Sequence, residues 1–177
     1  MGLVALGLEP KDRVAIIGDS RPEWLYADLG NLSVNGISVG IYATCSAEEV
    51  KYHLSHSEAR FFFVENEEQL DKALEIRDQL PKLEKIVVMD MKGLKHFHDP
   101  MVISFDELLQ AGKEFDEKNP GLFEQRLEKT GPDDIATFVY TSGTTGPPKA
   151  ALLSHFNVLS NSNAFAKHVP AFDTDEI

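Results

Sequence analysis

The chain has 177 residues, of which 42% are hydrophobic and 26% are charged, and its formal net charge at pH 7 is -12. This length is sufficient for one domain with a substantial core. A helix that spans a bilayer needs a run of about 18 apolar residues, which the sequence lacks. Because an acidic surface repels phosphate backbones, we expect no nucleic-acid partner.

The cysteine content and the N-terminus bear on the cellular setting. The single cysteine, Cys45, can form neither a disulfide within the chain nor a multi-thiolate metal site, and this favours a reducing, intracellular environment. The segment MGLVALGLEP lacks the basic start and cleavage site of a signal peptide. Leu6 stands where a myristoylation signal requires Ser or Thr. We therefore expect no targeting signal here and a cytoplasmic location.

Four short apolar runs in the first half of the chain predict strands at 14–17, 37–41, 61–64 and 86–89. The segments between them carry apolar stripes at helical spacing. The stripes are Trp24, Leu25, Leu29 and Leu32; Ala47, Val50 and Leu54; and Leu70, Ala73, Leu74 and Leu80. Apolar strands that alternate with amphipathic helices are typical of a parallel sheet covered on both faces. We predict an α/β fold, a doubly wound and mostly parallel sheet with flanking helices, whose first layer covers 1–90.

Four pairs of residues have the spacing of a capping box, in which one side chain caps the first helical turn and a second reaches back to it. The pairs are Ser20 with Glu23, Ser46 with Glu49, Asn66 with Gln69, and Ser104 with Glu107. Each pair predicts the start of a helix.

The second half of the chain is more polar. Residues 91–132 predict an irregular excursion around one short helix that follows Ser104. An apolar run resumes at Ile135–Tyr140 and a second follows at Ala150–Leu153, after which Ser154 is a predicted helix cap. Residues 133–177 are therefore predicted to form a strand, a loop, a strand and a helix.

The stretch VYTSGTTGPPKAALLSH, residues 139–155, carries the strongest functional signal. A Walker-type loop is excluded, because Gly143 and Gly146 are too close and Ala150 replaces the hydroxyl that binds Mg²⁺. The composition still suits an oligophosphate, since glycines expose backbone amides while hydroxyls and a lysine add donors and charge. The candidate donors are Thr141, Ser142, Gly143, Thr144, Thr145, Gly146 and Lys149. A surface turn without a ligand is the alternative.

The order of these residues resembles the phosphate-binding signature of the adenylate-forming superfamily, which includes acyl-CoA synthetases, luciferases and adenylation domains. The matching residues are Tyr140, Thr141, Ser142, Gly143, Thr144, Thr145, Gly146, Pro148, Lys149 and His155. Ala150 departs from the pattern, in which a glycine usually follows the lysine, and this puts loop mobility in question. The Trp24 region, the turn GIYAT from Gly40 and the run SEAR from Ser57 are similar to the N-terminal domain of long-chain fatty acid–CoA ligases.

The resemblance implies a partial N-terminal domain of an adenylate-forming enzyme and a reaction in two steps. A fatty acid carboxylate attacks the α-phosphate of ATP to give an acyl-adenylate, and coenzyme A then displaces AMP. It also implies that the hydroxyls and amides of residues 141–146 hold the β- and γ-phosphates. Lys149 would balance their charge beside Mg²⁺, so Thr141 and Lys149 are the catalytic candidates. Because the family's adenine, ribose and C-terminal segments are missing, we expect a fragment that completes neither half-reaction alone.

Other chemistry has weaker support. His96 and His98 have a spacing that suits a metal, but no third ligand is obviously placed, so we predict no metal site formed by side chains. Cys45 lies near His53 and His56 in the sequence, but a small hydrophobic role explains it better than a nucleophilic one.

Two non-enzymatic alternatives remain open. One is a nucleotide- or phosphate-binding module without catalysis, and the other is an interaction fragment that self-associates through an exposed half-core. The parent family works in the cytosol or at the cytosolic face of membranes, which also implies a peripheral membrane association of the complete enzyme.

Overall fold

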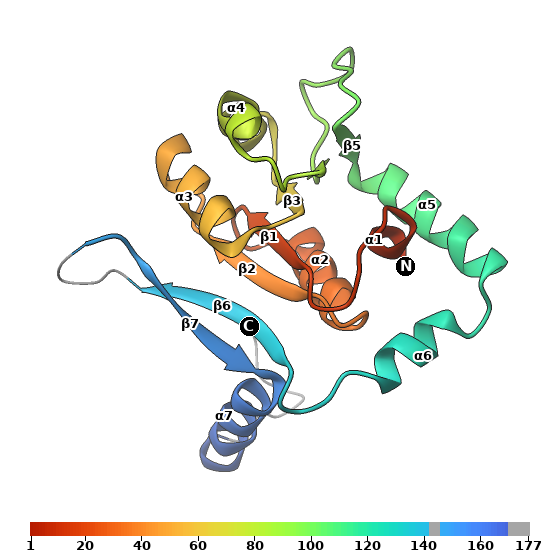
Figure 1. The fold of residues 1–177 in the computed structure, drawn as a ribbon, viewed down its shortest axis with the longest axis vertical. Helices are drawn as coiled ribbons and strands as arrows, with labels where there is room; N and C mark the ends of the chain where they lie inside the picture. Colours follow the sequence, from red (N-terminus) through yellow and green to blue (C-terminus); the bar gives the residue numbers. More distant parts are fainter. Residues whose placement is uncertain (142–145, 170–177) are drawn as a thin grey trace.

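The computed structural model describes residues 1–141 and 146–169, and within them it shows one seven-stranded sheet flanked by helices (Figure 1). The strand order is β5-β4-β3-β1-β2-β6-β7. The strands are β1 (Arg13–Ile17), β2 (Ile37–Ile41), β3 (Phe61–Val64), β4 (Lys85–Val88), β5 (Val102–Ser104), β6 (Ile135–Thr141) and β7 (Lys149–Ser154). Neighbouring strands are parallel except β6 and β7. The predicted α/β class and mostly parallel sheet are confirmed.

Helices cover both faces of this sheet. The helices are α1 (Gly2–Ala5), α2 (Pro22–Leu32), α3 (Ala47–Ser57), α4 (Glu67–Ile76), η1 (Arg77–Gln79), α5 (Phe105–Lys118), α6 (Leu122–Glu128) and α7 (His155–His168). Buried residues of α3 and α4 pack with Ala15 and Ile17 of β1, whereas those of α1, α2 and α5 pack with Val14 and Ile16. Because both faces of the central strands are covered, these strands can be continuously apolar.

The chain path explains why helices lie on opposite faces. From β1 the chain moves to β2 on one side, and from β2 it crosses back to β3 on the other side of β1. Since parallel crossovers are right-handed, this reversal places α2 and α3 on opposite faces. In such sheets, ligands bind beyond the carboxyl ends of the strands.

Three of the four predicted helix starts are confirmed. The pairs Ser46–Glu49 and Ser104–Glu107 form complete capping boxes. Asn66 caps α4 by accepting the backbone N–H of Gln69. The side chain of Gln69 does not reach back, because its amide donates to the carbonyl of Ala43.

The predicted start after Ser20 is wrong by one residue. The N-cap of α2 is Arg21, without a capping side chain, and Pro22 occupies the first turn. Proline favours the first helical position, because its fixed φ suits the helix and its missing N–H leaves no orphan donor. Glu23 is therefore the second residue of the helix, whereas a capping box needs the acidic residue at the third. Its carboxylate instead accepts a 2.7 Å hydrogen bond from the Arg21 guanidinium.

The apolar stripe predicted for α2 is wrong at Leu25 and Leu29, although Trp24 does pack against the core. The exposed fractions of Leu25 and Leu29 are 50% and 52%, whereas Ala27 and Asn31 are buried. Asn31 donates a 3.1 Å hydrogen bond to the hydroxyl of Ser38 in β2. The helix is thus oriented by a buried polar contact, which an apolar pattern cannot reveal.

Residues 91–132 hold more regular structure than the irregular excursion predicted for them. The helix after Ser104 exists, but it extends over 14 residues, and α6 follows it. β5 adds a parallel edge strand beside β4. With three half-buried residues, β5 is too short for its periodicity to be read from the sequence. Within the described ranges, no helix has the length and apolarity needed to cross a membrane.

The capping result leads to a stability prediction. Ser46→Ala should lower the free energy of unfolding by about 1 kcal/mol, because it removes the cap of α3. Ser20→Ala is the matched control and should change it by less than about 0.5 kcal/mol. Urea unfolding of the two variants measures the difference, and equal losses would contradict the assigned caps.

Candidate functional site

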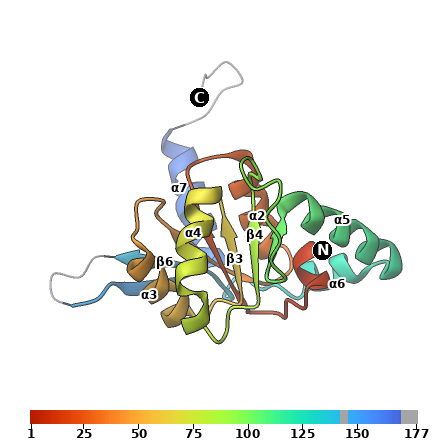
Figure 2. The ribbon, with the colours of Figure 1, turned by 90° about the horizontal axis from the view of Figure 1, so that it is seen from above.

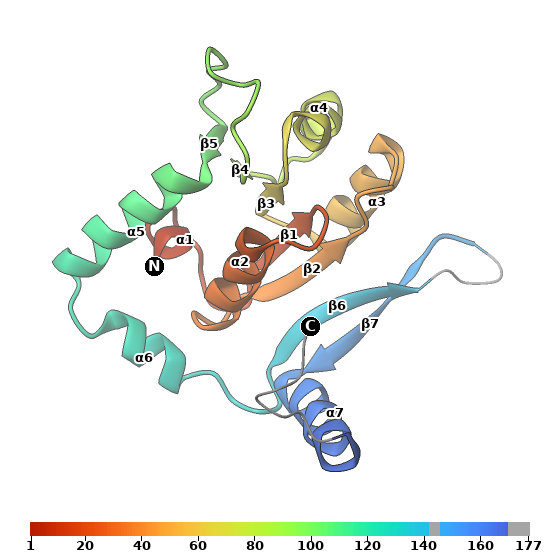
Figure 3. The same cartoon turned by 180° about the vertical axis from the view of Figure 1, so that it is seen from behind.

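The predicted phosphate-binding segment connects β6 and β7, an antiparallel hairpin at one edge of the sheet (Figure 3). Ser142, Gly143, Thr144 and Thr145 lie outside the described residues, so these predicted donors are not placed. The structure does place the two ends of the segment. Thr141 closes β6, and Gly146 and Lys149 lie on the β7 side. The strands predicted on either side of this segment correspond to β6 and β7.

The two candidate catalytic residues lie opposite each other. Thr141 pairs with Lys149 in the hairpin register, and the Thr141 hydroxyl donates to the Lys149 carbonyl at 3.5 Å. Both residues are exposed, and no carboxylate of the described residues forms an ion pair with Lys149. Gly146 has a φ of +102°, a left-handed conformation that favours glycine. The ends thus present a hydroxyl and a cation together.

Ala150, which departs from the family signature, fits its position. It lies within β7 opposite Tyr140. The residues with positive φ in the described chain do not include Ala150. Extended backbone suits alanine as well as glycine, so the strand accepts this side chain without backbone strain.

Helix α3 lies beside the hairpin (Figure 2), and sequence reasoning missed that its side chains contact both ends of the segment. The hydroxyl of Tyr52 donates a 2.7 Å hydrogen bond to the carbonyl of Pro148, which precedes Lys149. The hydroxyl of Tyr140, which precedes Thr141, lies 2.8 Å from Nδ1 of His56. In the sequence, His53 and His56 follow Tyr52 by one and four residues, which places Tyr52 and His56 on one side of a helix. This spacing gives no indication of the strand that they contact.

Aromatic packing and burial set the protonation of this group. The ring centroids of His53 and Tyr140 are 4.2 Å apart in an edge arrangement. Burial, and then the nearby Tyr52, raises the pKa of Tyr140 to about 12, so it remains a neutral phenol. Burial also lowers the pKa of His53, which therefore favours its neutral form. These groups are suited to hydrogen bonding rather than to general base catalysis by the phenol.

The other sequence candidates do not assemble into a second reactive centre. Burial raises the pKa of the Cys45 thiol, which opposes formation of the thiolate that a nucleophile needs. Within residues 1–141 and 146–169, no group of three or more His, Cys, Asp or Glu side chains is placed to hold a metal ion.

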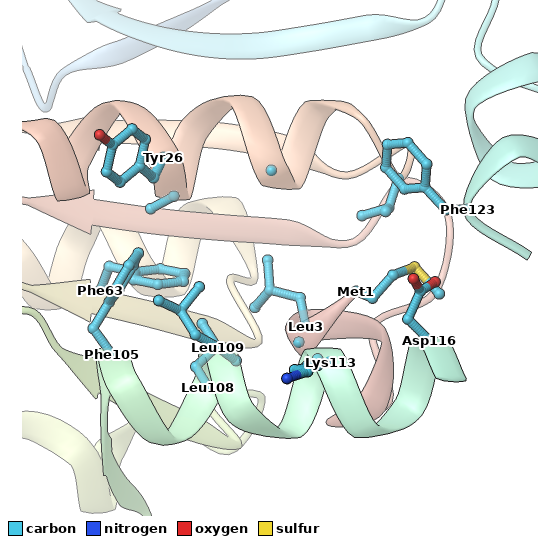
Figure 4. Close-up of a pocket in the computed structure, with 15 residues that line it drawn as sticks. Met1, Leu3, Tyr26, Phe63, Phe105, Leu108, Leu109, Lys113, Asp116 and Phe123 are labelled. Atoms are coloured by element: carbon cyan, nitrogen blue, oxygen red, sulfur yellow. The ribbon is translucent and has the colours of Figure 1, made fainter. Parts of the chain in front are cut away.

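An apolar cavity of about 370 Å³ lies elsewhere, between α1, α2, α5 and α6 (Figure 4). Leu3, Phe63, Phe105 and Leu108 line its interior, and Lys113 lies at its margin. The outer end of the β6–β7 hairpin lies on the opposite side of the molecule from α5 and α6 in both Figure 1 and Figure 2, and the residues that line the cavity include none from β6 or β7. The cavity is therefore separate from the hairpin site.

Comparison with known proteins agrees with the signature in the hairpin. A family model described as AMP-binding enzyme matches residues 1–177. The long-chain-fatty-acid–CoA ligase ACSBG2 of Xenopus laevis is 38% identical over 179 residues, which cover 99% of this chain and 24% of that protein. ACSBG2 of Homo sapiens is 34% identical, over 98% of this chain and 25% of that protein. The chain thus spans about a quarter of the length of these relatives.

Solved structures of adenylate-forming enzymes contain the same fold. The anthranilate CoA ligase AuaEII in complex with anthranoyl-AMP matches with a TM-score of 0.69 and 23% identity, over 94% of this chain and 28% of that chain. ATP-bound MatB from Rhodopseudomonas palustris matches with a TM-score of 0.66 and 25% identity, over 93% of this chain and 29% of that chain.

The lowered pKa of His53 leads to a prediction of pH-dependent stability. Its folded-state pKa lies below the ordinary value of 6.5, so the unfolded state binds more protons as the pH falls. The contribution of neutral His53 is therefore fully present above its ordinary pKa of 6.5 and is lost as the pH falls below that value towards the lowered folded-state pKa. His53→Phe, which keeps a ring against Tyr140, should weaken this dependence.

Urea unfolding of both proteins between about pH 8 and pH 5.5 tests this prediction, because the two chains differ only at position 53 and the difference between their pH slopes isolates that side chain. Identical pH slopes would contradict the assigned burial of His53.

Proposed function

Because the chain belongs to the AMP-binding enzyme family, we propose that it forms the N-terminal part of an ATP-dependent long-chain fatty acid–CoA ligase and supplies the ATP phosphate-binding loop. The observation that carries this proposal is the hairpin, which holds Thr141 and Lys149 opposite each other at the ends of the family signature. The relatives named as long-chain-fatty-acid–CoA ligases support the substrate class. The same proposal gives the complete enzyme ATP, a fatty acid and coenzyme A as substrates, in the cytoplasm or at the cytosolic face of a membrane.

The proposed chemistry depends on position and charge. A carboxylate oxygen attacks the α-phosphorus of ATP while the bond to pyrophosphate breaks, so negative charge develops on the leaving group. We assign Thr141 and the amide of Gly146 to positioning the β- and γ-phosphates, with Ser142, Gly143, Thr144 and Thr145. Lys149 balances the developing charge. In the second step, the thiol of coenzyme A attacks the acyl carbonyl and AMP leaves.

No Mg²⁺ ligand is assigned to this chain, because its described residues contain no metal-binding group of side chains. Mg²⁺ commonly binds through substrate phosphates with few protein ligands, and when bound it would supply further charge neutralisation there. The Lys149 ammonium is the cation that the described part of the hairpin itself contributes.

Replacement of this lysine tests the proposal. Lys149→Ala should raise the Kd of the chain for pyrophosphate and ATP roughly tenfold or more, because a charge-assisted bond contributes about 1.5–3 kcal/mol. Lys149→Arg should retain part of the affinity. Lys113→Ala, an exposed lysine on α5 at the other end of the molecule, is the control. Titration calorimetry of the 177-residue chain measures all four proteins, and an unchanged Kd in Lys149→Ala would refute the assignment.

An interaction function is the second candidate, because α7 leaves several large apolar side chains exposed. No residue of this helix is buried. Its exposed apolar side chains include Phe156, Leu159 and Phe165, with exposed fractions of 59%, 59% and 65%. Large exposed apolar patches mark interaction surfaces.

A module that binds phosphate without catalysis would retain the loop chemistry but form no acyl-adenylate.

Self-association through α7 would be visible in solution. The 177-residue chain should elute from a sizing column as dimers or larger species at concentrations of about 100 μM, because burial of this surface gains about 25 cal/mol per Å². The double variant Phe156→Ser with Leu159→Ser should remain monomeric. Light scattering on the column effluent measures the mass, and a monomeric parent chain would exclude this candidate.

A further inference from the structure

The outer part of the β6–β7 hairpin has little support from the sheet. β6 pairs with β2 only at Ser38–Thr137 and Val39–Phe138. Beyond these pairs, the hydrogen-bonded strand partner of Val139, Tyr140 and Thr141 within the described chain is β7. A two-stranded ribbon is marginally stable by itself in water. The ends of the phosphate-binding segment therefore need another support.

Helix α3 provides that support from one side. Tyr52 bonds to the carbonyl of Pro148 at 2.7 Å and His56 bonds to the hydroxyl of Tyr140 at 2.8 Å, so one helix contacts β6 and the residue that precedes β7. The rings of Tyr52 and His56 are stacked with centroids 5.5 Å apart, and each meets the ring of Tyr140 edge-on. Adjacent turns of α3 thus form one aromatic surface.

The helix that carries these side chains is itself firmly placed. A complete capping box at Ser46 begins it, and its residues Val50 and Leu54 are buried in the core, with exposed fractions of 0% and 1%. Side chains on such a helix hold their partners more precisely than side chains on a loop.

On this geometry we propose that Tyr52, His56 and Tyr140 form a positioning clamp that fixes Thr141 and Lys149 for an oligophosphate. The proposal rests on the proposed function of the loop and adds positioning residues to it. The clamp side chains act through the backbone of the hairpin, not through the ligand. By ordering the two ends before binding, they reduce the conformational entropy that binding must overcome.

The hydrogen bond between His56 and Tyr140 is compatible with either tautomer of the imidazole. When Nδ1 of His56 is unprotonated it accepts the Tyr140 hydroxyl proton, and when it is protonated it donates to the Tyr140 oxygen. In the second case the phenol can direct its proton to the carbonyl of His53, which lies 3.5 Å away. The Tyr52 hydroxyl has a single role, since the Pro148 carbonyl can only accept.

Removal of single hydroxyl groups tests the clamp. Tyr52→Phe and Tyr140→Phe keep the rings and should each raise the Kd of the 177-residue chain for pyrophosphate by about threefold to tenfold, the range expected for one hydrogen bond. Tyr26→Phe is the matched control, because Tyr26 is 60% exposed on α2 and lines the separate cavity rather than the hairpin. Its Kd should equal that of the parent chain.

A rescue experiment separates positioning from general stability. His56→Ala should weaken pyrophosphate binding, whereas His56→Asn, whose amide can replace Nδ1 as a partner of Tyr140, should restore most of the affinity. Urea midpoints of the two variants should be similar, because His56 is exposed. Amide hydrogen exchange at residues 149–151 should accelerate in Tyr52→Phe even without ligand.

These outcomes separate the two proposals. In one outcome, the parent chain binds pyrophosphate and Lys149→Ala weakens the binding, but Tyr52→Phe changes neither the Kd nor the amide exchange at 149–151. This result would exclude the clamp and leave the proposed function standing. If Lys149→Ala has no effect while exchange accelerates in Tyr52→Phe, the α3 contacts order the hairpin but the phosphate function fails, and the clamp as a device for phosphate binding fails with it. Weakened binding together with faster exchange supports both.

Discussion

The pairing of β6 with β2 is the contact on which the candidate site depends. Two parallel residue pairs join these strands, and the hydroxyl of Thr137 adds a 3.0 Å bond to the carbonyl of Ser38. Ser38 is buried and also accepts the amide of Asn31 from α2. A small polar network thus connects a helix, a central strand and the hairpin. Because buried polar groups are costly when unpaired, this network favours one register for β6 and so fixes where the hairpin leaves the sheet.

Charge is distributed so that the scaffold and the site have different roles. The net charge of -12 disfavours anions in general, yet the proposed ligand carries several negative charges. The arginines are engaged in ion pairs within the scaffold; they are Arg13, Arg21, Arg60, Arg77 and Arg126. Lys149 forms no such pair with the described residues and extends from the hairpin edge. A local cation near backbone donors can therefore bind phosphate although the average surface is acidic. At physiological ionic strength, salt largely screens the interaction between exposed charges that are more than about 8–10 Å apart.

The sequence predicts the features that depend on local pattern and misses those that depend on distant contacts. Apolar runs located the four central strands, and capping spacing located α3 and α5, because burial on both faces and orphan amides impose local requirements. Pro22 displaced one cap by a residue, and the buried Asn31 rotated α2 away from its apolar stripe. The clamp joins residues 84 and 96 positions apart, and no periodicity connects them. The predicted phosphate-binding role of Ser142, Gly143, Thr144 and Thr145 rests on the resemblance of their sequence to the family signature.

The apolar surface of α7 bears on how the hairpin site would be completed. A 14-residue helix is marginal alone in water, and α7 has a capping box at Ser154 but no buried residue. Packing of a partner against its exposed apolar side chains would stabilise both the helix and β7, from which it continues directly. The hairpin is held from one side by α3, so a partner for α7 would order it from a second side. Because the cost of ordering Thr141 and Lys149 falls as each support is added, phosphate affinity should be coupled to whatever covers this helix. The proposed phosphate function and the exposed side chains of α7 are linked in this way through β7, which carries Lys149 at one end and leads into α7 at the other.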